Sequence, residues 1–212
     1  MSIDRAALLP AIERLTAAMD AAFDRLNAAD GALGDGDLGV TMTRGMALVS
    51  EAAPELPDDL GQALLRCAQA FTKSSGSSYG TLLATGLMAM AKATKGRTVI
   101  EVGDLSGLVA VARDAMIARG KAELGGKTVL DSLDAVARGL DGVTAPAAAA
   151  AAAPEAARAA LDAFRPRPAT VGRARIFAEK SRGLDDPGML AMTLIVEALA
   201  GRGDDPEGRK PG

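Results

Sequence analysis

The stretch LLPAIERLTAAMDAAF, residues 8–23, sets the pattern from which the fold can be predicted. Its large apolar side chains recur every three or four residues, at Leu8, Ile12, Leu15, Met19 and Phe23. This spacing puts them on one face of an α-helix, so we expect an amphipathic helix from about residue 4 to residue 29. The whole chain is 49% hydrophobic but only 2% aromatic, so its core must be built mainly from Ala, Leu, Val, Ile and Met. Ala and Leu are the strongest helix formers, which favours closely packed helices.

The rest of the chain is divided by Gly and Pro residues into further helical segments. We expect helices over about residues 40–53, 58–71, 79–94, 102–119, 128–140, 155–164, 171–181 and 187–200. Residues 145–154 are interpreted as a loop, and 98–102 as an extended segment rather than a strand. The fold class is therefore all-α: a barrel or bundle of about eight antiparallel helices. Residues 1–200 are expected to form a single domain, with 201–212 as a flexible tail.

Composition excludes several classes of function. The net charge is −3 with no basic run, and aromatic residues are scarce, so we expect no nucleic-acid partner. No apolar stretch reaches the roughly 18 residues of a membrane span, no signal peptide is recognisable, and Cys67 is the single cysteine. We therefore expect no membrane contact and a cytoplasmic location, with Cys67 packed as a small hydrophobe. Histidine is absent, which excludes His-dependent nucleophiles, phosphohistidine and imidazole metal ligands.

The segment DGALGDGDLG, residues 30–39, holds the best candidates for chemistry. Asp30, Asp35 and Asp37 lie among four glycines, which allow a tight turn that can bring the carboxylates together. Converging carboxylates repel one another unless a cation lies between them, and an all-oxygen ligand set favours a hard cation such as magnesium. The alternative is a solvated Asp–Gly turn. An EF-hand loop counted from Asp35 is excluded, because its fifth and twelfth positions are Gly39 and Met46.

Three other motifs are weaker when taken alone. Gly126-Lys127-Thr128 resembles the end of a P-loop, but Lys121 stands where the motif needs Gly and no strand precedes it, so we reject that interpretation. The run SSGSS, residues 74–78, has small hydroxyl side chains before a helix and could hold phosphate, although most such runs are ordinary loops. The sequence DDPG, residues 185–188, is interpreted as a helix N-cap with proline in the first turn.

Together these motifs resemble the L subunit of dihydroxyacetone kinase, which also occurs as the C-terminal nucleotide domain of single-chain dihydroxyacetone kinases. The similar stretches are AADGALGDGDLGVTMTRG from Ala28, SSGSSYGT from Ser74, ARGKAELGGKTVLDSL from Ala118 and GRARIFAEKSRGLDDPG from Gly172. They occur in the family's order and span residues 28–188. The resemblance implies a barrel of about eight antiparallel helices with a nucleotide, ADP or ATP, at one end.

The resemblance also implies a role for each matched residue. Asp30, Asp35 and Asp37 would be catalytic by holding two Mg²⁺ ions against the phosphates, which suits a reaction that depends on positioning and charge neutralisation. The resemblance also implies nucleotide-binding residues: Leu38, Gly39, Thr41, Ser74 and Ser75 near the phosphates, Gly120, Val129, Asp186, Pro187 and Gly188 near the adenine and ribose, and Gly76 and Arg173 near the nucleotide.

Two positions depart from the family pattern: Leu38 replaces a usual His, and Lys73 replaces a usual Gly. In the family, the substrate subunit attaches the ketone to a histidine. Because this chain has none, the resemblance implies a separate DhaK-like substrate-binding partner. The phosphate donor is either ATP or an ADP recharged by a phosphotransferase-system protein, and a homodimer is allowed. The alternatives are the nucleotide domain of fatty acid kinase and a degenerate helical nucleotide-binding or regulatory module.

Overall fold

The structure is a computed structural model that describes residues 2–73 and 77–201, and over these residues the fold is helical. Nine α-helices account for most of the described chain: α1 Arg5–Ala21, α2 Phe23–Leu33, α3 Leu38–Ala52, α4 Leu60–Thr72, α5 Ser78–Ala93, α6 Leu105–Gly120, α7 Val129–Gly139, α8 Pro146–Phe164 and α9 Pro187–Leu199. Three short 3-10 helices join them: η1 Ala53–Glu55, η2 Val102–Asp104 and η3 Arg173–Phe177. The prediction of an all-α fold is therefore confirmed. In the predicted tail, residues 202–212 lie outside the described residues.

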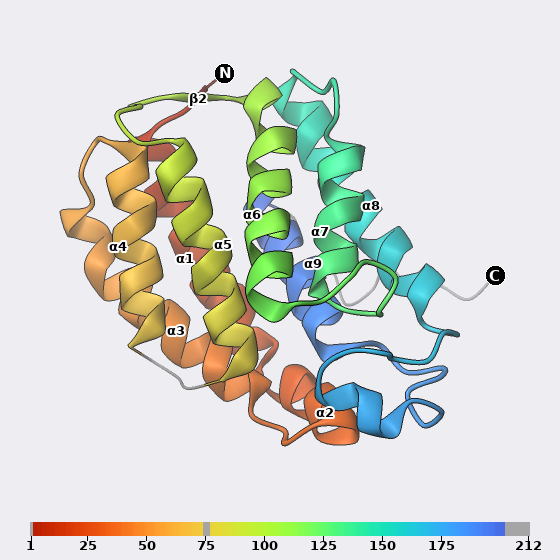
Figure 1. Cartoon of the computed structure of the whole chain (residues 1–212). Coiled ribbons are helices and arrows are strands. Elements are labelled where there is room, and N and C mark those ends of the chain that lie inside the picture. The colour runs from red at the N-terminus through yellow and green to blue at the C-terminus, as the bar shows by residue number, and fades with distance from the viewer. Residues whose placement is uncertain (1, 74–76, 202–212) are drawn as a thin grey trace.

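The helices pack side by side in a bundle (Figure 1). From α3 to α9 each helix contacts the next in sequence, and both α3 and α9 also pack against α1. Helix α9 is buried at every position from Met189 to Leu194, so it is covered on all sides. Over the described residues, no helix combines the length and the apolarity that crossing a bilayer would require.

Small residues let the helices approach closely where large aromatic side chains are few. A Cβ built on Gly45 of α3 would lie 2.3 Å from the ring of Phe71 in α4. A Cβ on Gly61 of α4 would lie 2.6 Å from the carbonyl oxygen of Ala91 in α5. Both distances are far below a van der Waals contact, so any side chain at these positions would push neighbouring helices apart. Glycine thus lets α3 lie against the ring of Phe71 and lets α4 lie against the backbone of α5.

The single helix expected over residues 4–29 is wrong in detail, because the chain forms two helices. The amide of Ala22 closes the last turn of α1 by bonding to Ala18 and Asp20, and α2 then begins at Phe23. Leu26 and Leu33 continue the apolar spacing into α2 and are buried. Because the three-or-four spacing persists across the break, the apolar stripe does not reveal where the helix ends.

Three other local expectations are corrected by the structure. Residues 145–154, expected as a loop, belong to α8, where Pro146 occupies the first turn and the high helix propensity of alanine outweighs the internal Pro154. Residues 171–181, expected as an α-helix, contain only η3, which follows Gly172 at a φ of 69°. The extended segment 98–102 contains a two-residue strand, β2 (Ile100–Glu101), which pairs antiparallel with β1 (Ser2–Ile3).

Candidate functional site

Four helices begin at one cavity, at the end of the bundle where α2 lies (Figure 1). The cavity is lined by the first residues of α3, α5, α7 and α9. Helix N-termini present backbone N–H groups and partial positive charge, so their convergence favours an anionic ligand. The lining residues are Asp30, Leu33, Asp35, Asp37, Leu38, Ser77, Ser78, Tyr79, Leu82, Thr128, Val129, Val171, Gly172, Ala174, Asp186, Pro187 and Gly188.

The three predicted carboxylates meet at this cavity. Asp30 lies in the last turn of α2, and Asp35 and Asp37 lie in the turn between α2 and α3. One oxygen from each of the three lies within 4.8 Å of the others, a group that satisfies the geometry of a metal site among the described residues. Gly34 makes this possible, because a Cβ there would lie 2.6 Å from Oδ1 of Asp30. An all-carboxylate set of this size suits a hard divalent cation.

The environment of Asp30 differs from that of its two partners. Asp30 is half-buried and accepts a hydrogen bond from the backbone N–H of Asp37 at 2.9 Å, whereas Asp35 and Asp37 are exposed. Burial raises the pKa of Asp30 and the negative charge of Asp35 adds to that rise, while backbone amides of the turn oppose it. A divalent cation would favour the ionised form of Asp30 and so oppose the rise of its pKa, which means that the geometry fits the metal implied by the sequence.

The start of α3 is held in place by Asn27, a residue that sequence analysis missed. Its Oδ1 accepts hydrogen bonds from the backbone N–H groups of Gly39 at 2.8 Å and Val40 at 3.4 Å. A Cβ on Gly39 would lie 2.4 Å from the carbonyl oxygen of Phe23, so only glycine allows α3 to pass this close to α2. Asn27 thus fixes the orientation of the helix that carries Leu38 into the cavity. Its position one turn before Asp30 was the available signal.

The opposite wall is formed by the start of α9. Asp186 caps this helix by accepting the backbone N–H of Met189 at 2.8 Å, which confirms the N-cap predicted for residues 185–188. Burial raises the pKa of Asp186 to about 7, while backbone amides and the charge of Lys127 oppose the rise. The hydroxyl of Tyr79 donates to the carbonyl oxygen of Gly188 at 3.2 Å and so ties α5 to α9 across the cavity.

The predicted nucleotide-binding residues fall into four groups. Leu38, Val129, Asp186, Pro187 and Gly188 line the cavity with the acidic triad. Gly39 and Thr41 lie beside it but are buried, and the N–H of Thr41 is bonded to Asp37. Gly120 ends α6 near Leu82, and Arg173 follows the lining residue Gly172. Ser74, Ser75 and Gly76 lie outside the described residues.

Tyr79, Leu82 and Val171 are lining residues that the sequence did not single out. They come from the N-terminal half of α5 and from the segment before η3. Each is an ordinary apolar or aromatic residue, so no local pattern distinguishes it from a core residue. They give the cavity an apolar part beside the carboxylates, which is the combination expected for a ligand with a ring and a charged tail.

Comparison with known proteins finds a matching family and similar relatives. The sequence profile of the DAK2 domain family matches residues 32–201. The chain is 30% identical over 208 residues to the PEP-dependent dihydroxyacetone kinase, ADP-binding subunit DhaL, of Escherichia coli, covering 94% of this chain and 98% of that protein. It is 31% identical to the PTS-dependent dihydroxyacetone kinase, ADP-binding subunit DhaL, of Lactococcus lactis, covering 82% of this chain and 85% of that protein.

Solved structures show the same fold. The native dihydroxyacetone kinase of C. freundii superposes with a TM-score of 0.75 at 23% identity, covering 92% of this chain and 34% of that one. The same enzyme in complex with AMP-PNP and Mg²⁺ gives a TM-score of 0.69, covering 95% of this chain and 34% of that one.

Proposed function

The chain belongs to the DAK2 domain family, and on that premise we propose that it is the Mg–adenine-nucleotide subunit of a kinase for dihydroxyacetone or a related short ketose. The observation that carries this proposal is the convergence of three carboxylates and four helix N-termini on one cavity. Carboxylates attract a divalent cation and helix N-termini attract phosphate, so the cavity combines the two preferences that a magnesium nucleotide satisfies together.

Asp30, Asp35 and Asp37 would hold the metal, which we propose to be two Mg²⁺ ions. When bound, magnesium supplies charge neutralisation and orientation of the phosphate oxygens. The protein's own part is to hold the carboxylates in place: Gly34 leaves room for Asp30, and the amide of Asp37 fixes its carboxylate. This preorganisation matters because phosphoryl transfer depends mainly on positioning and electrostatics.

The adenine and ribose would lie on the opposite side of the cavity. Val129 and the start of α9 form that wall, and Tyr79, Leu82 and Val171 add apolar surface around it. Asp186, Pro187 and Gly188 would contact the sugar and base, with Gly120 and Arg173 nearby. Leu38 lines the phosphate side and is 5% exposed, so it excludes water there without donating a hydrogen bond.

We also propose that turnover needs a second, substrate-binding subunit. The chain has no histidine, so it cannot attach a ketone in the way implied by the family resemblance. The Escherichia coli and Lactococcus lactis relatives are themselves described as subunits. We expect the pure chain to leave dihydroxyacetone unphosphorylated with ATP, and to support phosphorylation once the substrate-binding subunit from the same genome is added. Robust turnover by the pure chain would contradict this arrangement.

The proposed phosphate donor is either ATP or an ADP that is recharged in place. The two DhaL relatives are named as ADP-binding, and their kinases as PEP- or PTS-dependent. The L-erythrulose kinase of Pectobacterium atrosepticum is equally similar at 30% identity, but the matched region is only 34% of that protein. Native mass spectrometry of the purified chain tests the donor directly. Retained ADP supports an ADP that is recharged in place, whereas an empty site that binds Mg-ATP reversibly supports exchange.

Calorimetry with Mg-ADP tests the proposed function itself. We expect one nucleotide per chain, with binding abolished by a magnesium chelator. A folded chain that binds no Mg-ADP would instead support the degenerate helical module. We further propose that residues 1–200 form the single domain responsible, which is compatible with a family match that ends at residue 201.

A further inference from the structure

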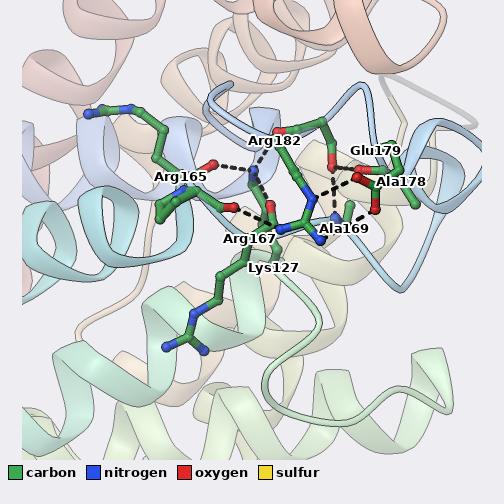
Figure 2. A network of polar contacts seen from close by, with 9 residues as sticks. Lys127, Arg165, Arg167, Ala169, Ala178, Glu179 and Arg182 are labelled. Carbon is green, nitrogen blue, oxygen red and sulfur yellow. Dashed lines mark hydrogen bonds and ion pairs between the residues drawn. The ribbon is translucent and has the colours of Figure 1, made fainter.

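Lys127 is the most buried charged residue of the described chain, and it lies next to the cavity without lining it. Its side chain is 1% exposed, and its backbone φ is 61°, in the left-handed region. The ammonium nitrogen donates to the backbone carbonyl oxygens of Arg165 at 3.0 Å and Arg167 at 2.9 Å (Figure 2). It also donates to the backbone carbonyl oxygen of Ser181 at 2.7 Å. All three N–H donors of the Lys127 ammonium therefore have main-chain partners.

The three carbonyls select the charged form of Lys127. An ammonium has three N–H donors and no acceptor, so it can satisfy all three oxygens, whereas a neutral amine has only two N–H groups. Burial lowers the pKa of Lys127, while the negative charges of Asp186 and Asp185 oppose that change. The site is thus a complete hydrogen-bonding shell for one cation, built from main-chain atoms.

These carbonyls come from the two ends of one segment, residues 165–181. Further bonds hold the same ends together: the N–H of Gly183 donates to Arg165 at 2.8 Å, and the N–H of Ala169 donates to Oγ of Ser181 at 2.7 Å. The N–H of Thr170 also donates to the carbonyl oxygen of Gly126 at 3.2 Å. Lys127 bonds to both ends of the segment from outside it. The side chain of Arg182 does so as well, by donating to the carbonyl oxygen of Pro166 at 3.2 Å and to the carboxylate of Glu179 at 2.8 Å, but Arg182 is exposed whereas Lys127 is buried.

The segment held by Lys127 carries part of the cavity wall. Val171, Gly172 and Ala174 lie between the clamped ends and line the cavity. On the other side of Lys127, the next two residues, Thr128 and Val129, line the cavity as well. A displacement of the Lys127 side chain would therefore move two parts of the cavity lining, residues 171–174 and residues 128–129, although no atom of Lys127 needs to contact the ligand.

We propose that Lys127 is a positioning residue for the base and ribose side of the nucleotide site, which it shapes by clamping both ends of residues 165–181. The inference rests on the proposed function. On this proposal, different residues hold the two sides of the cavity in place. The phosphate side depends on the acidic triad and the start of α3, which Lys127 does not contact. The segment that Lys127 clamps meets that side where Ala169 and Ala174 pack against Leu33. The base side depends on the 165–181 segment and the start of α7, which Lys127 joins.

Calorimetry with two ligands tests this separation. Mg-ADP occupies both sides, whereas Mg-pyrophosphate carries the metal and phosphates without base or ribose. We expect Lys127→Met to weaken Mg-ADP by about tenfold or more and Mg-pyrophosphate by less than about threefold. Lys121→Met is the matched control, because Lys121 is exposed and also has a positive φ, of 48°. The control should bind both ligands as the wild type does.

Hydrogen exchange on the ligand-free proteins provides the second readout. Lys127→Met should speed amide exchange within residues 165–183 by about tenfold or more, with α3 and α4 unchanged. If Lys127→Met does not fold, Lys127→Gln replaces it, because its amide keeps two N–H donors and so leaves at least one of the three carbonyl oxygens without a bond from this side chain. For this milder variant we expect about threefold faster exchange in the segment and about threefold weaker Mg-ADP binding.

The outcomes separate failure of this inference from failure of the proposed function. Wild-type protein that binds no Mg-ADP overturns the proposed function, and the inference falls with it. Wild-type protein that binds Mg-ADP, with a folded Lys127→Met that binds it equally well, overturns the inference alone. Equal weakening of Mg-ADP and Mg-pyrophosphate would also overturn it, because that pattern belongs to a general loss of structure. The same criteria apply to Lys127→Gln where it stands in for Lys127→Met.

Discussion

The acidic triad and the Lys127 shell lie at the same end of the bundle but balance charge in opposite ways. Asp30, Asp35 and Asp37 bring three carboxylates within 4.8 Å, and two of them are exposed. Lys127 is a single cation enclosed by three carbonyl oxygens and is 1% exposed. In the triad like charges converge on a shared space, whereas around Lys127 the protein supplies every acceptor that the cation needs.

This difference distinguishes a ligand-binding site from a structural one. A cluster whose charges repel and whose oxygens face a cavity is completed by a cation from outside, so it costs stability until the ligand arrives. A buried charge whose partners are all main-chain atoms is already complete, and removing it leaves those atoms unpaired. Substitutions in the two regions should therefore have opposite consequences for the ligand-free protein.

Lys127→Met should produce the largest loss of stability. Three carbonyl oxygens would lose a hydrogen bond to a charged group, each worth about 1.5–3 kcal/mol, and relief of the buried charge would offset part of this. We expect the free energy of unfolding to fall by about 3 kcal/mol in urea titrations, with Lys121→Met within about 0.5 kcal/mol of wild type. A loss below about 1 kcal/mol would mean that the Lys127 shell is not structural.

Asp186 should make stability depend on pH, because burial raises its folded pKa to about 7 from an ordinary value of 3.8. A raised pKa in an acid means that folding favours the protonated form, so its contribution is present below about pH 4 and lost as pH rises to about 7. Lys127 and Asp131 face this carboxyl with opposite effects on its pKa. Asp30 contributes with the same sign, since its pKa is also raised.

One proton changes the unfolding free energy by at most about 1.4 kcal/mol per pH unit. Between pH 5 and pH 7 we therefore expect the unfolding free energy of Asp186→Asn to fall by about 2 kcal/mol less than that of wild type. Urea titrations at several pH values measure this difference against wild type. An identical pH profile in the variant would show that Asp186 is ionised in the folded protein throughout this range.

Asn27→Ala should have a smaller effect, because it removes a cap rather than a buried charge. The amides of Gly39 and Val40 would lose their acceptor, and losing an N-cap typically costs about 1 kcal/mol. Unfolding in urea measures the loss, and Asn27→Asp, which keeps an acceptor oxygen, should recover part of it. Full stability in the alanine variant would show that water replaces the cap at no cost.

Asp35→Asn should have the smallest effect on the ligand-free protein. Asp35 is exposed, and its charge is one of the causes that raise the pKa of Asp30. Removing it relieves repulsion, so we expect a free energy of unfolding within about 0.5 kcal/mol of wild type, and not below it. A loss as large as that of Lys127→Met would erase the contrast between the two regions.

Of these two regions, only the acidic triad could be predicted from the sequence. The acidic triad is local in sequence, since Asp30, Asp35 and Asp37 fall within one glycine-rich turn, and the structure brings their oxygens together. The caps at Thr128 and Asp186 are local as well and were found for the same reason. Helix content followed from propensity and apolar spacing, which operate over a few residues.

The Lys127 shell could not be predicted, because its partners are carbonyls of distant residues. Every residue has a carbonyl, so Arg165, Arg167 and Ser181 carry no sequence signal for this role. The same limit applies to Asn27, whose partners lie across a turn. Such features depend on the meeting of segments that only the folded chain defines.

The central claim, that the triad holds a magnesium nucleotide, is tested most directly by thermal unfolding with Mg-ADP. At about 100 times its dissociation constant the ligand adds roughly 2.7 kcal/mol, which corresponds to a rise in Tm of roughly 5–10 °C for a domain of this size. The account predicts this rise for wild type and for Asp141→Asn, an exposed control just beyond the C-terminal end of α7, and its loss with a chelator. It predicts that Asp35→Asn loses most of the rise at the same ligand concentration. An Asp35→Asn protein that keeps the full magnesium-dependent rise would contradict the account.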